Sequence, residues 1–224
     1  MLVKIKRQSA PDSDSYWQSF QYNGPRHVTV SAVLDALNYT DDLFDVEGNV
    51  AVRIRWECSC MQAVCGACAM IINGVPALAC TTFVDEVKGE ELVLEPLSKF
   101  PVVADLIVDR SIIYDNLKEA KVYLENNAEN NGKHYAQQYS VAKCLKCGLC
   151  LEVCPNYHPG SSFFGAVLAN EGYLTASQSN DEENRTVKEY RKHFGAGCSK
   201  ALSCQTVCPA GIETITSILR MNRA

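Results

Sequence analysis

Four cysteines between residues 144 and 154 form the motif from which the chemistry of this chain can first be inferred. Cys144, Cys147, Cys150 and Cys154 are followed by Pro155, which gives the spacing C-x2-C-x2-C-x3-C-P. This spacing holds iron–sulfur clusters: three of the cysteines bind one cluster, and the fourth binds a neighbouring cluster. The motif therefore predicts a second cysteine run that completes both clusters.

The second run lies near the C-terminus and lacks one cysteine. It comprises Cys198, Cys204 and Cys208 before Pro209, and Ala201 stands where the template would place another thiol. Exchange of the fourth ligands gives a [4Fe–4S] cluster four thiolates: Cys144, Cys147, Cys150 and Cys208. The exchange gives the other cluster only three: Cys154, Cys198 and Cys204. Because alanine offers no ligand, a [3Fe–4S] cluster is the simplest species that fits.

A third set precedes both runs and has the plant-type [2Fe–2S] spacing C-x4-C-x2-C. It comprises Cys60, Cys65 and Cys68. Residues 70–78 predict two strands around Asn73-Gly74, a strong hairpin signal, and this hairpin would return Cys80 to the side of Cys68 as the fourth ligand. Pro76 places the returning strand at a sheet edge or at a bulge. Cys58 is left over, and we interpret it as a thiol packed beside the cluster loop.

Composition limits the other functions open to the chain. With 224 residues and twelve cysteines but no apolar leader after Met1, the thiols are expected to be metal ligands in a reducing compartment. The net charge of −5 and the lack of a basic patch argue against nucleic acid as a partner. We find no nucleotide-binding glycine motif, no catalytic triad and no HExxH motif, so catalytic residues are not expected. None of the four histidines has ligand spacing, although His158 and His193 could border a cluster.

The elements that must position these cysteines suggest an α+β chain of two domains. Strands at residues 2–5 and 16–22 and a helix capped by Ser31, burying Val33, Leu34, Leu37 and Tyr39, precede the first metal loop. This order is that of a β-grasp [2Fe–2S] ferredoxin-like domain, expected over residues 1–103. Helices at 111–125, 163–170 and 214–221, with polar loops at 125–138 and 177–185, predict an all-α ferredoxin-like domain with two clusters over residues 104–224.

The chain resembles the iron–sulfur subunit of succinate dehydrogenase and fumarate reductase, which belong to respiratory complex II. The resemblance runs almost end to end and includes the three cysteine sets, Lys4–Arg7, Cys65–Met70 with Asn73-Gly74, Glu95–Leu97, Phe100–Val103 and Asp105–Asp109. The run Cys147–Pro155 is most similar to the menaquinone-linked branch.

This resemblance implies a non-catalytic electron-transfer subunit with two kinds of partner. The [2Fe–2S] cluster would face a flavoprotein subunit carrying FAD, and the [3Fe–4S] cluster would face a transmembrane anchor, often with haem b, near menaquinone or another quinone. The implied location is the cytoplasmic face of the bacterial inner membrane, to which the anchor would hold the chain.

One departure from the family and three alternatives remain. Ubiquinone-binding members commonly place a tryptophan and a histidine beside the [3Fe–4S] cluster, where this chain has Pro159 and Ser199; no quinone site is therefore transferred to it.

The first alternative is a relay subunit of another flavin-dependent reductase, such as a thiol-linked fumarate reductase. The others are a zinc-stabilised interaction protein and a free electron carrier.

Overall fold

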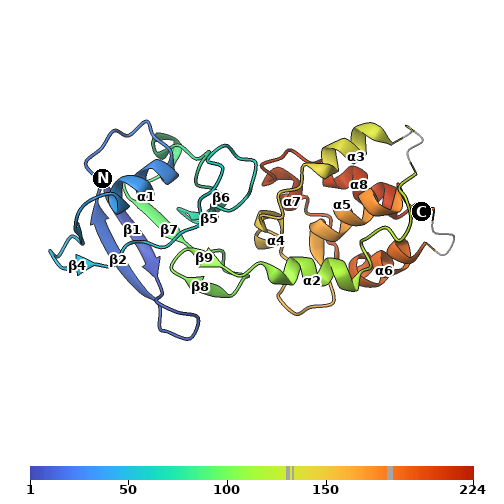
Figure 1. Ribbon diagram of the computed structural model, residues 1–224, viewed down its shortest axis with the longest axis horizontal. Helices are drawn as coiled ribbons and strands as arrows, with labels where there is room; N and C mark the ends of the chain where they lie inside the picture. The colour runs from blue at the N-terminus through green and yellow to red at the C-terminus, as the bar shows by residue number, and fades with distance from the viewer. Residues whose placement is uncertain (130–131, 133, 181–183) are drawn as a thin grey trace. The chain divides into compact units, whose positions relative to one another are not determined.

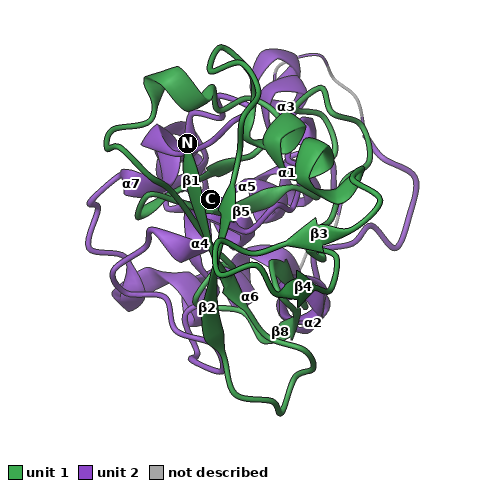
Figure 2. Cartoon of the chain, turned by 90° about the vertical axis from the view of Figure 1, so that its left-hand side faces the viewer, with its two compact units in different colours: residues 1–109 green, residues 110–224 purple. Residues whose placement is uncertain are grey.

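The computed structural model describes residues 1–129, 132, 134–180 and 184–224 and divides into two compact units (Figures 1 and 2). Unit 1 comprises Met1–Asp109 and unit 2 comprises Arg110–Ala224. The division falls after Asp109 rather than after residue 103, because Asp105 pairs with Arg7 and Arg55 of unit 1. The α+β fold class predicted from the sequence is confirmed.

Unit 1 is built on a five-stranded sheet in the order β2-β1-β7-β5-β6. Its strands are β1 (Leu2–Arg7), β2 (Tyr16–Gln21), β5 (Ala69–Ile72), β6 (Val75–Leu78) and β7 (Leu92–Glu95). The central pair β1 and β7 is parallel, and the other neighbouring strands are antiparallel. Alternate residues of this pair, among them Ile5 and Leu94, are fully buried, so one face of the sheet forms the core.

The helix α1 (Val30–Asn38) buries Val33, Leu34 and Leu37, as predicted. Two details of the prediction are wrong. Thr29 caps the helix, because its extended backbone lets its side chain accept a hydrogen bond from the Ala32 N–H at 3.3 Å, whereas Ser31 already lies inside the helix. Tyr39 follows the last helical residue, so its ring leaves the buried face and is 85% exposed.

Three hairpins and one 3-10 turn complete the described part of unit 1. The β5–β6 hairpin pairs Ile72 with Val75 and Ala69 with Leu78, and β6 lies at the sheet edge, which confirms the positions inferred from Asn73-Gly74 and Pro76. Two short hairpins were not predicted: β3 (Leu43–Phe44) with β4 (Val50–Ala51), and β8 (Val102–Ala104) with β9 (Ile107–Val108). A 3-10 turn, η1, covers Val84–Glu86.

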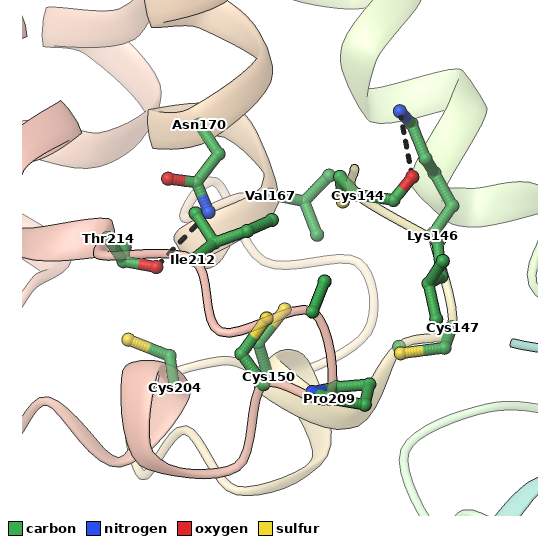
Figure 3. Close-up of a pocket in the computed structure, with 14 residues that line it drawn as sticks. Cys144, Lys146, Cys147, Cys150, Val167, Asn170, Cys204, Pro209, Ile212 and Thr214 are labelled. Atoms are coloured by element: carbon green, nitrogen blue, oxygen red, sulfur yellow. Dashed lines mark hydrogen bonds between the residues drawn. The ribbon is translucent and has the colours of Figure 1, made fainter. Parts of the chain in front are cut away.

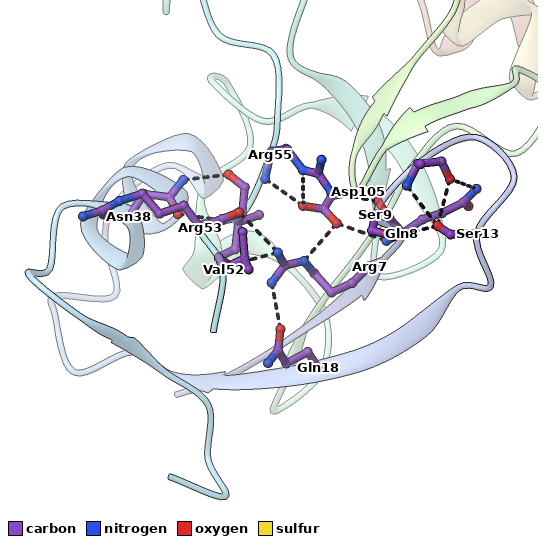
Figure 4. Close-up of polar contacts among 12 residues, drawn as sticks. Arg7, Gln8, Ser9, Ser13, Gln18, Asn38, Val52, Arg53, Arg55 and Asp105 are labelled. Atoms are coloured by element: carbon purple, nitrogen blue, oxygen red, sulfur yellow. Dashed lines mark hydrogen bonds and ion pairs between the residues drawn. The ribbon is translucent and has the colours of Figure 1, made fainter. Parts of the chain in front are cut away.

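An ion-pair network joins the β8–β9 turn to β1 and to the segment before the first cysteine loop (Figure 4). Asp105, which is 1% exposed, lies 3.1 Å from Arg7 Nε and 3.3 Å from Arg55 Nε. Its carboxylate also accepts hydrogen bonds from the backbone N–H groups of Gln8 and Arg55. This network fixes the direction in which the chain enters the cysteine loop.

Unit 2 is helical. Its longer helices are α2 (Ser111–Glu119), α3 (Tyr135–Ala142), α5 (Gly165–Ala176), α6 (Arg185–Phe194) and α8 (Thr214–Met221). Its short elements are α4 (Leu149–Glu152), the 3-10 turn η2 (Gly195–Gly197) and α7 (Ser203–Thr206). The central helix α5 packs against α2, α3, α4, α6 and α8. Among the described residues, no helix is long and apolar enough to cross a membrane.

The helices predicted for unit 2 agree in place, and one of the three also agrees in length. The helix α8 has the predicted bounds, α2 ends at Glu119 rather than at 125, and α5 begins at Gly165 and continues to Ala176. The predicted loops at 125–138 and 177–185 are interrupted at their ends by α3 and α6. Residues 130, 131, 133 and 181–183 of those loops lie outside the described residues.

Candidate iron–sulfur centres

The first cysteine loop of unit 1 turns its backbone N–H groups toward cysteine sulfurs. Met61, Ala63 and Gly66 have positive φ angles of 55°, 59° and 76°, which bend the chain tightly around the loop. Cys60 Sγ accepts hydrogen bonds from the N–H groups of Gln62 at 3.3 Å and Val64 at 3.4 Å. Such bonds stabilise a thiolate, which is the form that binds iron.

The ionisation of Cys60 follows from these contacts. Backbone hydrogen bonds from Gln62 and Val64 lower the pKa of Cys60 to about 7, with a further contribution from the neighbouring Cys65. The N–H of Ala67 points in the same way to Cys65 Sγ, at 3.5 Å. The loop therefore favours the deprotonated ligand before any metal is considered.

The β5–β6 hairpin brings the remaining two thiols of this set together. The Ala79 N–H donates to the Cys68 carbonyl at 3.1 Å, which extends the hairpin pairing to the two buried residues Cys68 and Cys80. Burial and the adjacent Cys80 thiol raise the pKa of Cys68 to about 12. A metal centre would therefore be needed to hold this thiol as a thiolate.

In unit 2, the first cysteine run forms one wall of a pocket closed by α5 and the segment leading into α8 (Figure 3). Five cysteines line this pocket: Cys144, Cys147, Cys150, Cys204 and Cys208. Four of them are the residues to which the spacing assigned the [4Fe–4S] cluster. Positive φ angles at Lys146 (52°) and Gly148 (87°) turn the loop between them.

These thiols are too crowded to ionise together without a cation. Burial raises the pKa of Cys150 well above its ordinary value, and the neighbouring thiols of Cys147, Cys144, Cys204 and Cys208 raise it further. Burial likewise raises the pKa of Cys144 to about 12; the Glu171 carboxylate adds to this rise and Lys146 opposes it. Soft, crowded thiolates match the ligands that iron–sulfur clusters take.

The second run repeats the loop geometry of the first, including the position without a cysteine. Lys200 and Leu202 have φ angles of 60° and 56°. They follow Cys198 by the same numbers of residues as Lys146 and Gly148 follow Cys144. Ala201 lies between them and is exposed. The second run thus repeats the backbone conformation of the first run around a position that has no thiol.

Cys204 lines the pocket of unit 2 and also lies near Cys154 and Cys198, which do not line it. Burial raises the pKa of Cys204, and among the thiols that add to this rise are Cys154 and Cys198. The side chain of Asn156 donates to the Gly197 carbonyl at 2.6 Å, which joins the end of the first run to the start of the second. The structure therefore brings Cys154 to the second run, as the ligand exchange requires.

The other residues singled out in the sequence do not line the pocket of unit 2. Cys58, His158, Pro159 and Ser199 are exposed. His193 is buried and stacks on Phe164, with its Nδ1 atom 3.0 Å from the Ser162 carbonyl oxygen. In the part of the chain that the structure describes, no three Cys, His, Asp or Glu residues are placed to hold a single metal ion.

Sequence reasoning missed several polar residues around the pocket. Lys146 pairs with Glu171 at 2.7 Å, and Asn170 donates to Thr214 at 3.1 Å. Lys146 lies within the first cysteine run, whereas no motif marks Asn170, Glu171 and Thr214, because α5 and α8 bring them to the cysteines only through tertiary packing.

Two domain families match the chain. Residues 2–115 match the 2Fe-2S iron-sulfur cluster binding domain, and residues 140–212 match the 4Fe-4S dicluster domain. The chain is 31% identical to the succinate dehydrogenase iron-sulfur subunit of Bacillus subtilis, over 98% of this chain and 90% of that protein. It is 28% identical to a fumarate reductase iron-sulfur subunit of Escherichia coli, over 97% of this chain and 90% of that protein.

Among solved structures, a chain of the Mycobacterium smegmatis Sdh1 complex has a similar fold. The TM-score is 0.73 at 20% identity, and the match covers 99% of this chain and 95% of that one.

Proposed function

The chain belongs to the family of succinate dehydrogenase and fumarate reductase iron–sulfur subunits, and from this premise we propose how its residues carry electrons. It is a non-catalytic electron-transfer subunit of complex II that carries [2Fe–2S] and [4Fe–4S] clusters. The observation that supports the assignment best is that Cys144, Cys147, Cys150 and Cys208, which come from two distant cysteine runs, line one pocket.

We assign each group to one cluster. The [2Fe–2S] ligands are Cys60, Cys65, Cys68 and Cys80. The [4Fe–4S] ligands are Cys144, Cys147, Cys150 and Cys208. The third group, Cys154, Cys198 and Cys204, would hold a [3Fe–4S] cluster, because Ala201 leaves one iron corner without a ligand.

These clusters supply one-electron transfer when bound, and the chain's own residues set the conditions for it. The loop N–H groups of Gln62 and Val64 stabilise charge on Cys60, and the surroundings of Cys150 partly desolvate the proposed [4Fe–4S] ligands. Hydrogen bonding and burial of the sulfurs are what set the potentials of such clusters.

Complex II membership gives the chain two kinds of partner, a flavoprotein subunit and a membrane anchor. We propose that the flavoprotein carries FAD and that electrons pass between it and menaquinone or another quinone near the anchor, which could carry haem b. Since Pro159 and Ser199 replace the residues that ubiquinone-binding members commonly use, the anchor would supply most of the quinone site. The proposed location is the cytoplasmic face of the inner membrane.

Anaerobic purification of the chain with its co-expressed partners tests this function. About nine iron atoms per chain are expected, the sum of a [2Fe–2S], a [4Fe–4S] and a [3Fe–4S] cluster. The oxidised protein should give the EPR signal of a [3Fe–4S] cluster, and dithionite should reveal the other two. Zinc in place of iron and acid-labile sulfide would refute the proposal.

A further inference from the structure

Two polar side chains share the pocket of the proposed [4Fe–4S] ligands (Figure 3). Asn170 comes from α5, and Thr214 is the first residue of α8. Both are almost fully buried, with 5% and 1% of their surface exposed. Buried polar groups in proteins are nearly always hydrogen-bonded, so the hydrogen-bond partners of both side chains must be identified.

The contact between them leaves one hydrogen unused. Asn170 Nδ2 donates to Thr214 Oγ1 at 3.1 Å, which occupies one lone pair of the hydroxyl group. A threonine hydroxyl can also donate its own hydrogen. Among the described residues, no acceptor pairs with that hydrogen, and Asn170 Oδ1 is likewise buried without a partner.

Because the Asn170 amide turns its Nδ2 atom toward Thr214, its own Oδ1 atom does not accept from that hydroxyl group, and the remaining side-chain acceptors in the pocket lining are the cysteine sulfur atoms. The pocket is almost entirely apolar apart from its five cysteines, Lys146, Asn170 and Thr214. Lys146 offers only N–H donors and is already paired with Glu171 at 2.7 Å. A hydroxyl hydrogen directed into the pocket therefore meets a thiolate ligand or the cluster itself.

We propose that the Thr214 hydroxyl group, oriented by Asn170, donates a hydrogen bond to a sulfur atom of the [4Fe–4S] centre and raises its reduction potential. The inference rests on the proposed function and adds residues that tune it. The reduced cluster carries one more negative charge than the oxidised cluster, so a donor to sulfur stabilises the reduced form more. Asn170 acts as a positioning residue, because its N–H fixes the rotation of the hydroxyl group.

The test compares Thr214→Val with Thr214→Ser in the purified complex. Valine has nearly the shape of threonine but no hydroxyl, whereas serine keeps the donor. EPR-monitored redox titration of the [4Fe–4S] signal should show that Thr214→Val lowers the ratio of reduced to oxidised cluster at a fixed potential by up to about tenfold, which is 59 mV for a one-electron couple. Thr214→Ser should titrate close to the wild type, and Asn170→Leu should shift in the direction of Thr214→Val.

Thr186→Val is the matched control. Thr186 is also buried in unit 2, but its hydroxyl group donates to the Lys121 carbonyl at 2.9 Å and it does not line the pocket. Its substitution should leave the [4Fe–4S] potential unchanged.

A second measurement detects the hydrogen itself rather than the potential. After exchange into D2O, pulsed EPR of the reduced wild-type cluster should detect an exchangeable deuteron coupled to it, and Thr214→Val should lose that coupling. Equal titration curves for the wild type and Thr214→Val, or the absence of the coupling in the wild type, would overturn the inference. Such a result is expected if the Asn170 amide is rotated so that Oδ1 faces Thr214, because the Thr214 hydroxyl group would then donate to Oδ1 and not to a sulfur atom. Failure of the proposed function is seen separately, as a wild-type protein with no [4Fe–4S] signal to titrate.

Discussion

At the scale of the residue, Ala201 is informative because it occupies, in the second run, the loop position that Cys147 occupies in the first. The loop around it has the same left-handed positions as the loop of the first run, at Lys200 and Leu202. Leucine rarely adopts a φ angle of 56°, whereas glycine holds the matching position at residue 148 without strain. If Cys198 and Cys204 ligate a cluster as proposed, that cluster would help to maintain the loop shape, together with the turn into α7.

Substitution Ala201→Cys should complete the ligand set. Since residue 201 is exposed and lies in a loop of cluster-binding shape, a new thiolate there can take the empty iron corner. We expect about one more iron atom per chain and loss of the [3Fe–4S] EPR signal from the oxidised protein. Ala201→Val is the control and should keep the signal. An Ala201→Cys protein that retains the full signal would contradict the ligand assignment.

Cys58 and Cys60 should respond differently to removal. Cys60 Sγ accepts two backbone N–H bonds within the loop, whereas Cys58 is exposed and lies before the loop turns. Cys60→Ser should abolish or strongly reduce the [2Fe–2S] EPR signal, and Cys58→Ser should leave it intact. The matched pair is measured by visible circular dichroism and EPR of the dithionite-reduced protein. Equal loss in both variants would show that Cys58 is a ligand or an essential neighbour.

At the scale of the element, Asp105 in the β8–β9 turn joins β1 to the segment before the first cysteine loop through Arg7 and Arg55. Burial alone would raise the pKa of Asp105, but hydrogen bonds from the Arg7 side chain and from the N–H groups of Arg55 and Gln8 lower it overall. A carboxylate whose folded pKa is lowered stabilises the fold above its unfolded pKa of about 3.8. That contribution is lost as the pH falls through the lower folded value.

Asp105→Asn should therefore destabilise unit 1 at neutral pH by about 3–5 kcal/mol, because it leaves Arg7 buried without its countercharge. Both tryptophans, Trp17 and Trp56, lie in unit 1, so tryptophan fluorescence during urea unfolding reports this unit. The difference from the wild type should shrink as the pH falls below about 3.8. Asp14→Asn, at an exposed position, is the control. A difference independent of pH would exclude the ionised network as its cause.

The elements that could be predicted from the sequence are those with strong local signals. Asn73-Gly74 determines the β5–β6 register, since residue 73 (φ 46°) and residue 74 (φ 78°) both take the left-handed conformation that this turn requires. The helix α8 has a regular apolar period and was predicted with its observed bounds. The two-residue strands β3 and β4 are too short for any periodicity, and the polar helix α6 resembles a surface loop in composition.

The same distinction applies to the candidate centres. Cysteine spacing predicts the groups, because a loop of a few residues determines which thiols can reach one cluster. The residues that modulate the groups could not be predicted. Asn170 and Thr214 are 44 positions apart and meet only because α5 packs against α8. Arg7 and Asp105 likewise come from distant parts of unit 1.

At the scale of the whole molecule, the two units have different tasks in one relay. In the proposed relay, the cysteine set of unit 1 would exchange electrons with the flavoprotein, and the two sets of unit 2 would continue the relay toward the anchor. A relay in series fails wherever one step is removed. The flavin chemistry on the partner does not depend on the later steps.

Cys154→Ser should therefore uncouple the assembled complex rather than inactivate it. Serine is a poor substitute for the thiolate that the third group needs, so the [3Fe–4S] signal should fall while the [4Fe–4S] and [2Fe–2S] signals remain. Succinate-dependent reduction of quinone should drop by at least about tenfold, a rise of 1.4 kcal/mol in the barrier. Reduction of an artificial dye that accepts electrons at the flavin should persist, and Cys58→Ser should keep both activities. Parallel loss of dye and quinone reduction would mean that Cys154 supports assembly instead, and loss of the [4Fe–4S] signal alone would place Cys154 in the other cluster.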